Sequence, residues 1–251
     1  MSDNLLIIQA RMSSTRFPGK VLEDLHGKPM IGYQIERLKK STLIDQIVVA
    51  TSIADSDNSL SEYLQSIDQP VIRGPLEDVL SRFLQVLDIY EPDYFIRITG
   101  DCPLVMPDLL DSMIREFENS DLDYLSNVLK PSYPDGLDIE IIKTSAIRRL
   151  SNYVLSPTER EHVTLGIYSR ASQYKLKNYN SNLAMQGERW TVDYPEDLEF
   201  IKRIVKFEQS QSDLLTIGQV LNFLDNNPEQ RNSLSGNLRN EALKDWEPQN
   251  E

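Results

Sequence analysis

The 251-residue sequence contains a single cysteine, Cys102, so an internal disulfide bond is excluded. Structural disulfides are typical of oxidising compartments, and their exclusion favours a reducing one. The N-terminus lacks the basic segment and long apolar stretch of a secretory signal. No run reaches the ~18 apolar residues that a membrane-spanning helix needs. We therefore expect a cytoplasmic protein with no membrane partner.

An excess of basic charge is also missing. The chain carries 26 Lys and Arg against 39 Asp and Glu, a formal net charge of −13. Non-specific nucleic-acid binding depends on a basic surface, so we expect no nucleic-acid partner. The first 40 residues depart from this balance, with seven Lys or Arg against four acidic residues. A small anionic ligand fits such a local basic region better than a polyanion does.

Glycine-rich fingerprints for phosphate binding are missing as well. Only Gly19-Lys20 matches a part of the P-loop pattern, and the three-glycine dinucleotide pattern does not occur. Instead, a polar and basic segment at 9–20 follows four apolar residues at 5–8 that are typical of a buried parallel strand. Loops that leave such strands bind ligands in open α/β sheets, and cations with hydroxyl and backbone N–H groups suit a polyphosphate. The alternative is a solvated basic turn.

Strands and helices are expected to alternate four times over residues 1–120. The expected strands are 5–8, 45–51, 70–72 and 93–99, and the expected helices are 30–40, 57–67, 76–90 and 107–117. This alternation predicts a Rossmann-like α/β fold, with a mostly parallel central sheet and helices on both faces.

The pattern is looser after residue 120. We expect strands at 124–128, 137–142, 174–178 and 189–192, and helices at 144–153, 156–172, 195–207 and 216–224. We predict one domain over residues 1–225, in which about 125–188 is a candidate for an inserted acceptor or dimerisation subdomain. Polar residues dominate 226–251, which we interpret as a C-terminal tail.

The segment Gln9-Ala10-Arg11-Met12-Ser13-Ser14-Thr15-Arg16-Phe17-Pro18-Gly19-Lys20 closely resembles the signature loop of the sugar cytidylyltransferases. This family includes CMP-Kdo synthetases and acylneuraminate cytidylyltransferases, and the residues here are most similar to the branch named for spore-coat polysaccharide biosynthesis. The resemblance covers roughly residues 5–205. It implies the nucleotide-diphospho-sugar transferase type of fold, and transfer of CMP from CTP to a sugar with release of pyrophosphate.

The resemblance implies that this loop and two later strand ends bind the nucleotide. The nucleotide-binding candidates are Gln9, Ala10, Arg11, Ser13, Ser14, Arg16, Lys20, Arg73 and Gly100. Arg73 ends the third expected strand, where it could read the base or ribose or could equally belong to a simple turn.

An aspartate follows each of two expected strands. Asp101 comes directly after Gly100, where a carboxylate can hold Mg²⁺ together with substrate phosphates, although a helix cap or Asx-turn is the alternative. Within the resemblance, Asp101 matches the Asp of a Gly-Asp-x-Pro-Leu motif that serves the metal. Asp193 matches the first Asp of a Val-Asp-Thr-Pro-Glu-Asp-Leu segment, with Tyr194 in place of Thr. The resemblance thus implies Mg²⁺ on Asp101 and Asp193, and Cys102 is interpreted as a small filler because no obvious His base accompanies it.

Two further segments are candidates for acceptor binding. Asp135, Asp138 and Glu140 open an expected strand, and carboxylates suit sugar hydroxyls, although a solvated edge strand is the alternative. Arg160 and His162 lie in an Arg-Glu-His-Val-Thr segment that the family shares, although a lone His is often structural. We list all five as acceptor-binding candidates.

The resemblance implies an in-line attack by a sugar oxygen on the α-phosphorus of CTP, with Arg11, Lys20 and Asp101 as the catalytic residues. One alternative is a transferase that uses another nucleoside triphosphate with a sugar 1-phosphate, but such enzymes usually carry a Gly-rich opening loop. Another is a glycosyltransferase of the same sheet type, which typically has two Asp around one residue at the position where this chain has one. The acceptor, an acidic or amino sugar, is left open. A homodimer is expected from the family alone.

Overall fold

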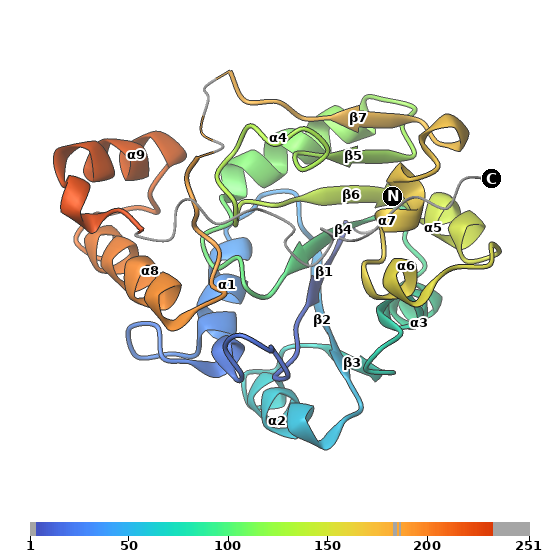
Figure 1. Cartoon of the computed structure of the whole chain (residues 1–251), viewed down its shortest axis with the longest axis horizontal. Coiled ribbons are helices and arrows are strands. Elements are labelled where there is room, and N and C mark those ends of the chain that lie inside the picture. The colour runs from blue at the N-terminus through green and yellow to red at the C-terminus, as the bar shows by residue number, and fades with distance from the viewer. Residues whose placement is uncertain (1–3, 183–184, 186, 233–251) are drawn as a thin grey trace.

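A computed structural model describes residues 4–182, 185 and 187–232. Its main feature is a seven-stranded sheet with the order β3-β2-β1-β4-β6-β5-β7 (Figure 1). The strands are β1 (Leu5–Gln9), β2 (Gln46–Ser52), β3 (Val71–Gly74), β4 (Tyr94–Thr99), β5 (Tyr124–Ser126), β6 (Glu140–Lys143) and β7 (Leu176–Asn178). Among these strands only β6 runs against the others, since its pairings with β4 and β5 are antiparallel and the remaining pairings are parallel. The predicted mostly parallel α/β sheet is confirmed.

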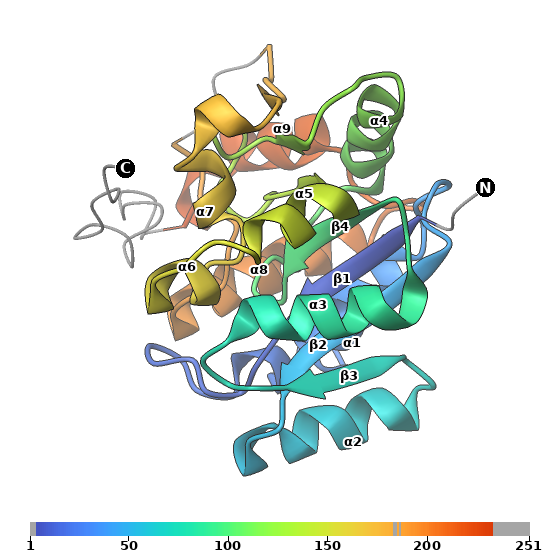
Figure 2. The same cartoon turned by 90° about the vertical axis from the view of Figure 1, so that its right-hand side faces the viewer.

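Helices cover both faces of this sheet, and Figure 2 shows α3 and α5 crossing in front of it. The α-helices of the described residues are α1 (Met30–Leu38), α2 (Asn58–Ser66), α3 (Val79–Tyr90), α4 (Pro107–Glu118), α5 (Thr144–Leu150), α6 (Pro157–Glu161), α7 (Leu165–Tyr168), α8 (Pro195–Glu208) and α9 (Ile217–Asn226). None of them is long and apolar enough to cross a membrane.

The central strand β1 is buried on both faces, which explains its continuous apolar run. Leu6 and Ile8 pack into a core formed with α1, α2, α4 and α8. Leu5 and Ile7 pack into a second core with α3, α5 and α7. Because the core holds β1 on both sides, the polar loop that follows it starts from a fixed position.

Three of the expected elements were wrong. The helix expected at 156–172 is two short helices, α6 and α7, because Val163 between them has a left-handed backbone with φ of 46°. The strand expected at 137–142 begins only at Glu140, since the Asn127 side chain bonds the O of Leu137 and the N of Ile139 in place of a neighbouring strand. Residues 189–192 make only an isolated bridge, between Arg189 and Asp135.

The loops after β1 and β4 lie at one edge of the sheet, and the chain before α8 joins them there. The backbone N of Val192 donates to the O of Asp101 over 2.9 Å, which fixes this third segment beside β4. Residues 125–188 contribute β6 and β7 to the same sheet. Of the predicted tail, residues 233–251 lie outside the described residues.

Candidate active site

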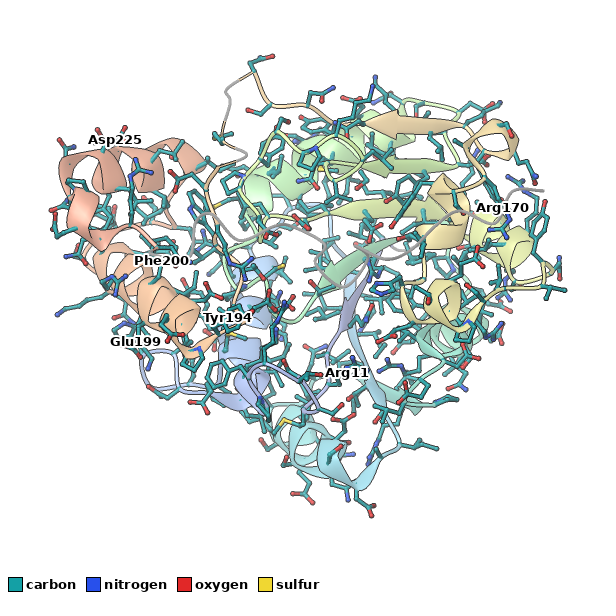
Figure 3. The ribbon with its side chains drawn as sticks, in the orientation of Figure 1. Arg11, Arg170, Tyr194, Glu199, Phe200 and Asp225 are labelled. Atoms are coloured by element: carbon teal, nitrogen blue, oxygen red, sulfur yellow. The ribbon has the colours of Figure 1, made fainter. Side chains whose placement is uncertain are left out.

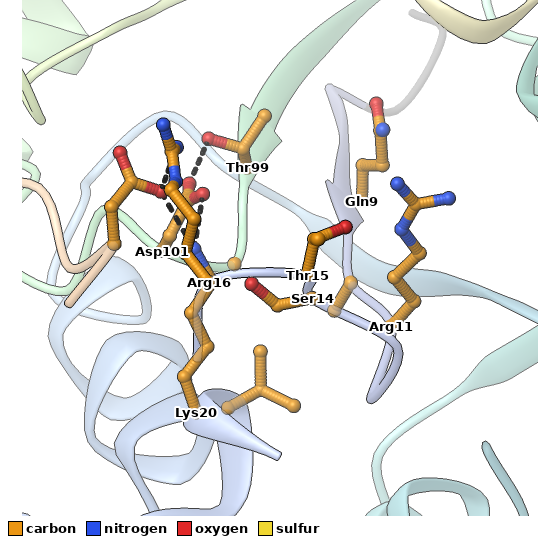
Figure 4. Close-up of a pocket in the computed structure, with 12 residues that line it drawn as sticks. Gln9, Arg11, Ser14, Thr15, Arg16, Lys20, Thr99 and Asp101 are labelled. Carbon is orange, nitrogen blue, oxygen red and sulfur yellow. Dashed lines mark hydrogen bonds and ion pairs between the residues drawn. The ribbon is translucent and has the colours of Figure 1, made fainter. Parts of the chain in front are cut away.

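A cavity of about 430 Å³ opens at the carboxyl ends of β1 and β4 (Figure 4). It is lined by Gln9, Ala10, Arg11, Ser14, Thr15, Arg16, Lys20, Val21, Thr99, Gly100, Asp101 and Asp193. A second cavity of about 290 Å³ adjoins it and shares five of these residues, so the two form one continuous cleft. The structure therefore brings most of the predicted nucleotide-binding residues to one place.

The opening loop at 10–20 is held by backbone contacts at both ends. The N of Gly19 donates to the O of Met12 over 2.8 Å, and Gly19 has a left-handed φ of 79° that glycine adopts without strain. The N of Met12 donates to Oδ1 of the buried Asp57 over 2.7 Å. Asp57 lies just before α2, so the loop is tied to a part of the chain that its own sequence does not indicate.

Lys20 lies between the two aspartates predicted to hold a metal. Its Nζ donates to Oδ2 of Asp101 (2.9 Å), to Oδ1 of Asp193 (3.1 Å) and to the backbone O of Val192 (2.6 Å). An ammonium group has three N–H donors, and all three are used. In this arrangement Lys20 positions the carboxylates and offers no donor to a phosphate.

Both carboxylates are ionised at neutral pH. Burial raises the pKa of Asp101, but the charge of Lys20 and the hydroxyl of Thr99 outweigh it and leave the pKa lowered to about 2. Burial also raises the pKa of Asp193, but Lys20 and Arg189 outweigh burial and leave this pKa lowered. Arg16 also reaches Asp193, over 2.8 Å, and this cluster joins the loop to the chain before α8.

The site suits a magnesium ion that binds together with the nucleotide. It suits less well a magnesium ion that protein side chains hold by themselves. Asp101 and Asp193 supply two ionised carboxylates, and Mg²⁺ is commonly bound by one or two carboxylates together with phosphate oxygens. Among the described residues there is no group of three or more His, Cys, Asp or Glu side chains that could hold a metal by itself. The donor set is therefore compatible with the metal only once phosphate oxygens complete it.

Arg189 is a charged residue of the cleft that sequence reasoning missed. Its guanidinium pairs with Asp135 (3.0 Å), Asp193 (2.8 Å) and Asp197 (3.2 Å), and its side chain is almost fully buried. Asp135, predicted to bind the acceptor, is thus linked to Asp193, predicted to bind the metal. No local pattern indicates this pairing, since Asp135 and Arg189 are more than fifty residues apart.

The second cavity contains four of the five predicted acceptor-binding residues. Asp135, Asp138, Glu140 and His162 line it, and burial first of all lowers the pKa of His162, so this imidazole is neutral at pH 7. Glu140 accepts from the hydroxyls of Tyr124 (2.5 Å) and Thr164 (2.6 Å), and it pairs with Arg97. These bonds make Glu140 an anchor of the cavity wall.

Arg97 is a second residue that sequence reasoning missed. Besides its pair with Glu140, it donates to Oε1 of Gln9 through Nη2 (2.8 Å) and Nε (3.2 Å). The amide oxygen of Gln9 is thereby held, and its NH₂ group is oriented as a donor. Because Gln9 lines both cavities, Arg97 sets the hydrogen-bonding character of the boundary between them.

Three predicted residues line neither cavity. Arg160 pairs with Asp78, Nε to Oδ2 2.9 Å, and Arg73 donates through Nε to the backbone O of Ser52 over 2.8 Å. Ser13 lies in the opening loop but is not part of the cavity wall. Their assigned roles in binding remain predictions.

Cys102, by contrast, is buried within this edge of the sheet. Burial raises the pKa of its thiol well above the usual value, and the nearby charge of Asp101 raises it further. Such a thiol is a poor nucleophile, in agreement with its interpretation as a filler.

The loop and the start of α8 meet around the cleft. The guanidinium of Arg16 lies over the ring of Tyr194, 5.2 Å from its centre, in a cation–π contact. Figure 3 shows Arg11, two residues after the end of β1, and Tyr194, directly before α8, in the central part of the molecule. The tyrosine that replaces the threonine of the family segment thus packs on a cation of the opening loop.

Comparison with known proteins identifies the family. Residues 5–229 match the cytidylyltransferase family. The chain is 32% identical over 238 residues to the spore coat polysaccharide biosynthesis protein SpsF of Bacillus subtilis, covering 91% of this chain and 97% of that protein. It also resembles the solved structure of a cytidylyltransferase from Leptospira borgpetersenii, with a TM-score of 0.87 and 28% identity, covering 93% of this chain and 98% of that one.

A more distant structure has the same fold. It is a CMP:2-keto-3-deoxy-manno-octonic acid synthetase complexed with CTP, with a TM-score of 0.66 and 20% identity, covering 82% of this chain and all of that one. The resemblance noted in the sequence is confirmed, and the family match decides between the alternatives that the sequence left open. The chain belongs to the cytidylyltransferase family, and its activity is that of a CTP-dependent nucleotidyltransferase.

Proposed function

We propose that this cytidylyltransferase transfers CMP from CTP to a sugar, with release of pyrophosphate, in the synthesis of a surface polysaccharide. The observation that carries the proposal is the continuous cleft with two chemically different halves. One half is lined by the basic and hydroxyl-rich opening loop, and the other by carboxylates, hydroxyls and a neutral imidazole. The likeness to the spore coat protein SpsF supports a polysaccharide sugar as the acceptor.

The two halves meet at Asp101 and Asp193, where we place the α-phosphorus of CTP. A sugar oxygen from the second cavity forms a bond to this phosphorus, and the bond to the pyrophosphate oxygen breaks. Arg11 and Arg16, with the hydroxyl of Ser14, stabilise the negative charge on the phosphates and on the departing pyrophosphate. Lys20 acts as a positioning residue, because its hydrogen bonds hold both carboxylates in place.

Magnesium is the proposed cofactor, with Asp101 and Asp193 as its ligands. When bound with CTP, it would neutralise the charge that builds up on the phosphates. The remaining steps depend on the chain itself, which binds the triphosphate, orients the acceptor and keeps both carboxylates ionised through Lys20 and Arg189.

Isothermal calorimetry with CTP, UTP, GTP and ATP tests the first half of this proposal. We expect the wild-type protein to prefer CTP and to bind it more tightly with Mg²⁺ than with a chelator. Asp101→Asn should remove most of this magnesium dependence, and Asp121→Asn, at an exposed surface carboxylate, should leave it unchanged. Equal binding with and without Mg²⁺ in the wild type would refute the assignment of the metal.

A screen of acidic and amino sugars for pyrophosphate release tests the second half. Release of pyrophosphate with a sugar, and none with water alone, is the expected result. The homodimer and the cytoplasmic location are part of the proposal through the resemblance, and light scattering and cell fractionation test them. A protein that binds CTP and transfers CMP to none of the sugars would contradict the proposed acceptor class.

A further inference from the structure

Within the described residues, the buried guanidinium of Arg82 lacks a hydrogen-bond partner. The side chain of Arg82, on α3, is fully buried, and none of its three guanidinium nitrogens makes a hydrogen bond within the described residues. Leaving a charged group buried and unpaired is strongly unfavourable, and native proteins contain few such groups. An unpaired guanidinium at this depth therefore indicates a ligand that supplies the missing acceptors.

Arg82 lies close to the nucleotide half of the cleft. Its stem packs on the carboxyl end of β3, where a Cβ added at Gly74 would lie 2.7 Å from Cγ of Arg82. Burial and the neighbouring charge of Arg11, opposed by Asp57 and Asp78, lower the pKa of Arg82 to about 10. Arg11 lines the cleft, so the charge of Arg82 acts on a residue of the cavity wall, and Arg82 itself lines neither cavity.

Three carboxylates act on this guanidinium through their charge, Asp57, Asp78 and Glu77, and the first two are committed to other groups. Asp57 accepts from the backbone N of Met12 over 2.7 Å and thereby anchors the opening loop. Asp78 caps α3 by accepting from the N of Ser81 over 3.0 Å, and it pairs with Arg160 over 2.5 Å. None of the three makes a hydrogen bond to the buried arginine, so its donors stay available for a ligand.

The layout of the cleft indicates which part of the nucleotide comes near Arg82. Figure 4 shows Arg11 on one side of the opening loop and Asp101 with Lys20 on the other. The acceptor cavity extends from Asp101 toward β6, on one side of β1. Since the acceptor cavity lies on the β6 side, we infer that the nucleoside of a triphosphate bound at the loop extends to the opposite side of β1, toward β2, β3 and the start of α3, where Arg82 lies.

We propose that Arg82 recognises the cytosine base of CTP and makes the enzyme prefer CTP over UTP. Cytosine presents two adjacent acceptors, O2 and N3, and the guanidinium fork presents two parallel N–H donors that match them. Uracil carries an N–H at position 3, which would face an arginine donor. A buried donor that meets another donor discriminates strongly, because neither group can be satisfied elsewhere.

The base reaches Arg82 when two surface ion pairs separate. Helix α6 packs against α3 and is tied down by Arg160 to Asp78 and by Glu161 to Arg11, the latter over 3.3 Å. The side chains of both pairs are between 29% and 40% exposed, and ion pairs at such exposure are weak. Figure 2 shows α6 beside the first turn of α3, where it can cover a bound base.

Two readouts on Arg82→Met test this proposal, with Arg148→Met as the matched control. Arg148 is an exposed arginine, paired with Asp88 over 2.8 Å away from the cleft. Calorimetry with CTP and UTP, both with Mg²⁺, measures the preference, and thermal unfolding measures the stability of the free protein. We expect Arg82→Met to bind CTP about 10–100-fold more weakly and UTP nearly unchanged, so the preference is lost.

The unfolding midpoint distinguishes recognition from a structural role. Removal of an unpaired buried charge should leave the midpoint of Arg82→Met equal to or above that of the wild type, and Arg148→Met should change neither readout. An Arg82→Met protein that keeps the wild-type preference for CTP overturns the proposal, and so does a lowered midpoint with unchanged CTP binding.

Arg82→Lys keeps the charge and removes the fork, so it answers the same question if the methionine variant does not fold. We expect it to lose most of the preference for CTP over UTP, and retention of the full preference overturns the proposal. The wild-type measurement separates this inference from the proposed function. A wild type that binds no CTP contradicts the function itself, whereas one that binds CTP leaves the role of Arg82 to be decided by its variants.

Discussion

The bridge from Lys20 to Asp101 makes a stability prediction that depends on pH. In the folded protein the pKa of Asp101 is lowered from 3.8 to about 2, with Lys20 as the largest stabilising influence. At about 1.4 kcal/mol per pKa unit, this corresponds to about 2.5 kcal/mol of the free energy of unfolding. The Asp101 side chain is 27% exposed, and screening by solvent reduces the figure, so we expect about 1–2 kcal/mol.

The sign of the effect follows from the direction of the shift. A carboxylate whose pKa is lower in the folded state stabilises the fold above its unfolded pKa. The contribution is therefore complete above about pH 4 and is lost as the pH falls toward about 2. Burial alone would shift the pKa upward and reverse the trend, so the pH dependence reports on Lys20 together with the hydrogen bond from Thr99.

A double-mutant cycle of Lys20→Met and Asp101→Asn isolates the interaction. Urea unfolding of the wild type, both single variants and the double variant should give a coupling of about 1–2 kcal/mol at pH 7 that shrinks below pH 4. The matched control is the exposed pair of Lys28 and Glu36, for which we expect a coupling near zero at every pH. A Lys20–Asp101 coupling below about 0.5 kcal/mol at pH 7, or one equal at pH 7 and pH 3, would refute the reasoning.

Three other predictions concern Arg97, Thr216 and Cys102. Arg97→Met should lower the free energy of unfolding by about 3–5 kcal/mol in urea titrations, because it removes the cation that pairs with the buried Glu140. Adding Glu140→Gln should restore part of this loss, and no recovery in the double variant would contradict the prediction. Thr216→Ala removes the cap of α9 and should cost about 1 kcal/mol without changing CTP binding in calorimetry; weakened CTP binding would show that α9 influences the site. The thiol of Cys102 should react with a disulfide reagent only after unfolding in urea, since burial raises its pKa, and rapid reaction in buffer would contradict this.

Local patterns predicted the elements of the fold that depend on local interactions. The buried strand β1 and the helices α4 and α9 are confirmed close to the ranges expected for them, and Thr216 caps α9. The errors fall where a distant side chain replaces a regular contact. Asn127 bonds the backbone at 137–139, and the left-handed Val163 divides a helical pattern that the periodicity alone would continue.

The residues of the candidate site divide in the same way, into those that a local pattern predicts and those that depend on a distant partner. Asp101 and Asp193 could be predicted, since each follows an expected strand, and the structure brings them to one ammonium group. Arg97 and Arg189 could not, because their partners are separated from them by 43 residues or more along the chain, at Glu140 and Asp135. A charge within a strand pattern is ambiguous by itself, and only its partner decides its role.

Arg82 extends this argument to a residue that has no hydrogen-bond partner in the part of the chain that the structure describes. In the sequence it is one more basic residue in an amphipathic helix, on the side that the helical period assigns to the core. Periodicity predicts an apolar residue there, and the structure shows a guanidinium to which no carboxylate of the described residues makes a hydrogen bond. A charged residue at an apolar position of the helix, buried and without a pairing carboxylate, lowers the stability of the fold. The compensating gain then comes from what the protein binds. For a CTP-dependent transferase, the base is the part of the substrate that needs such a reader.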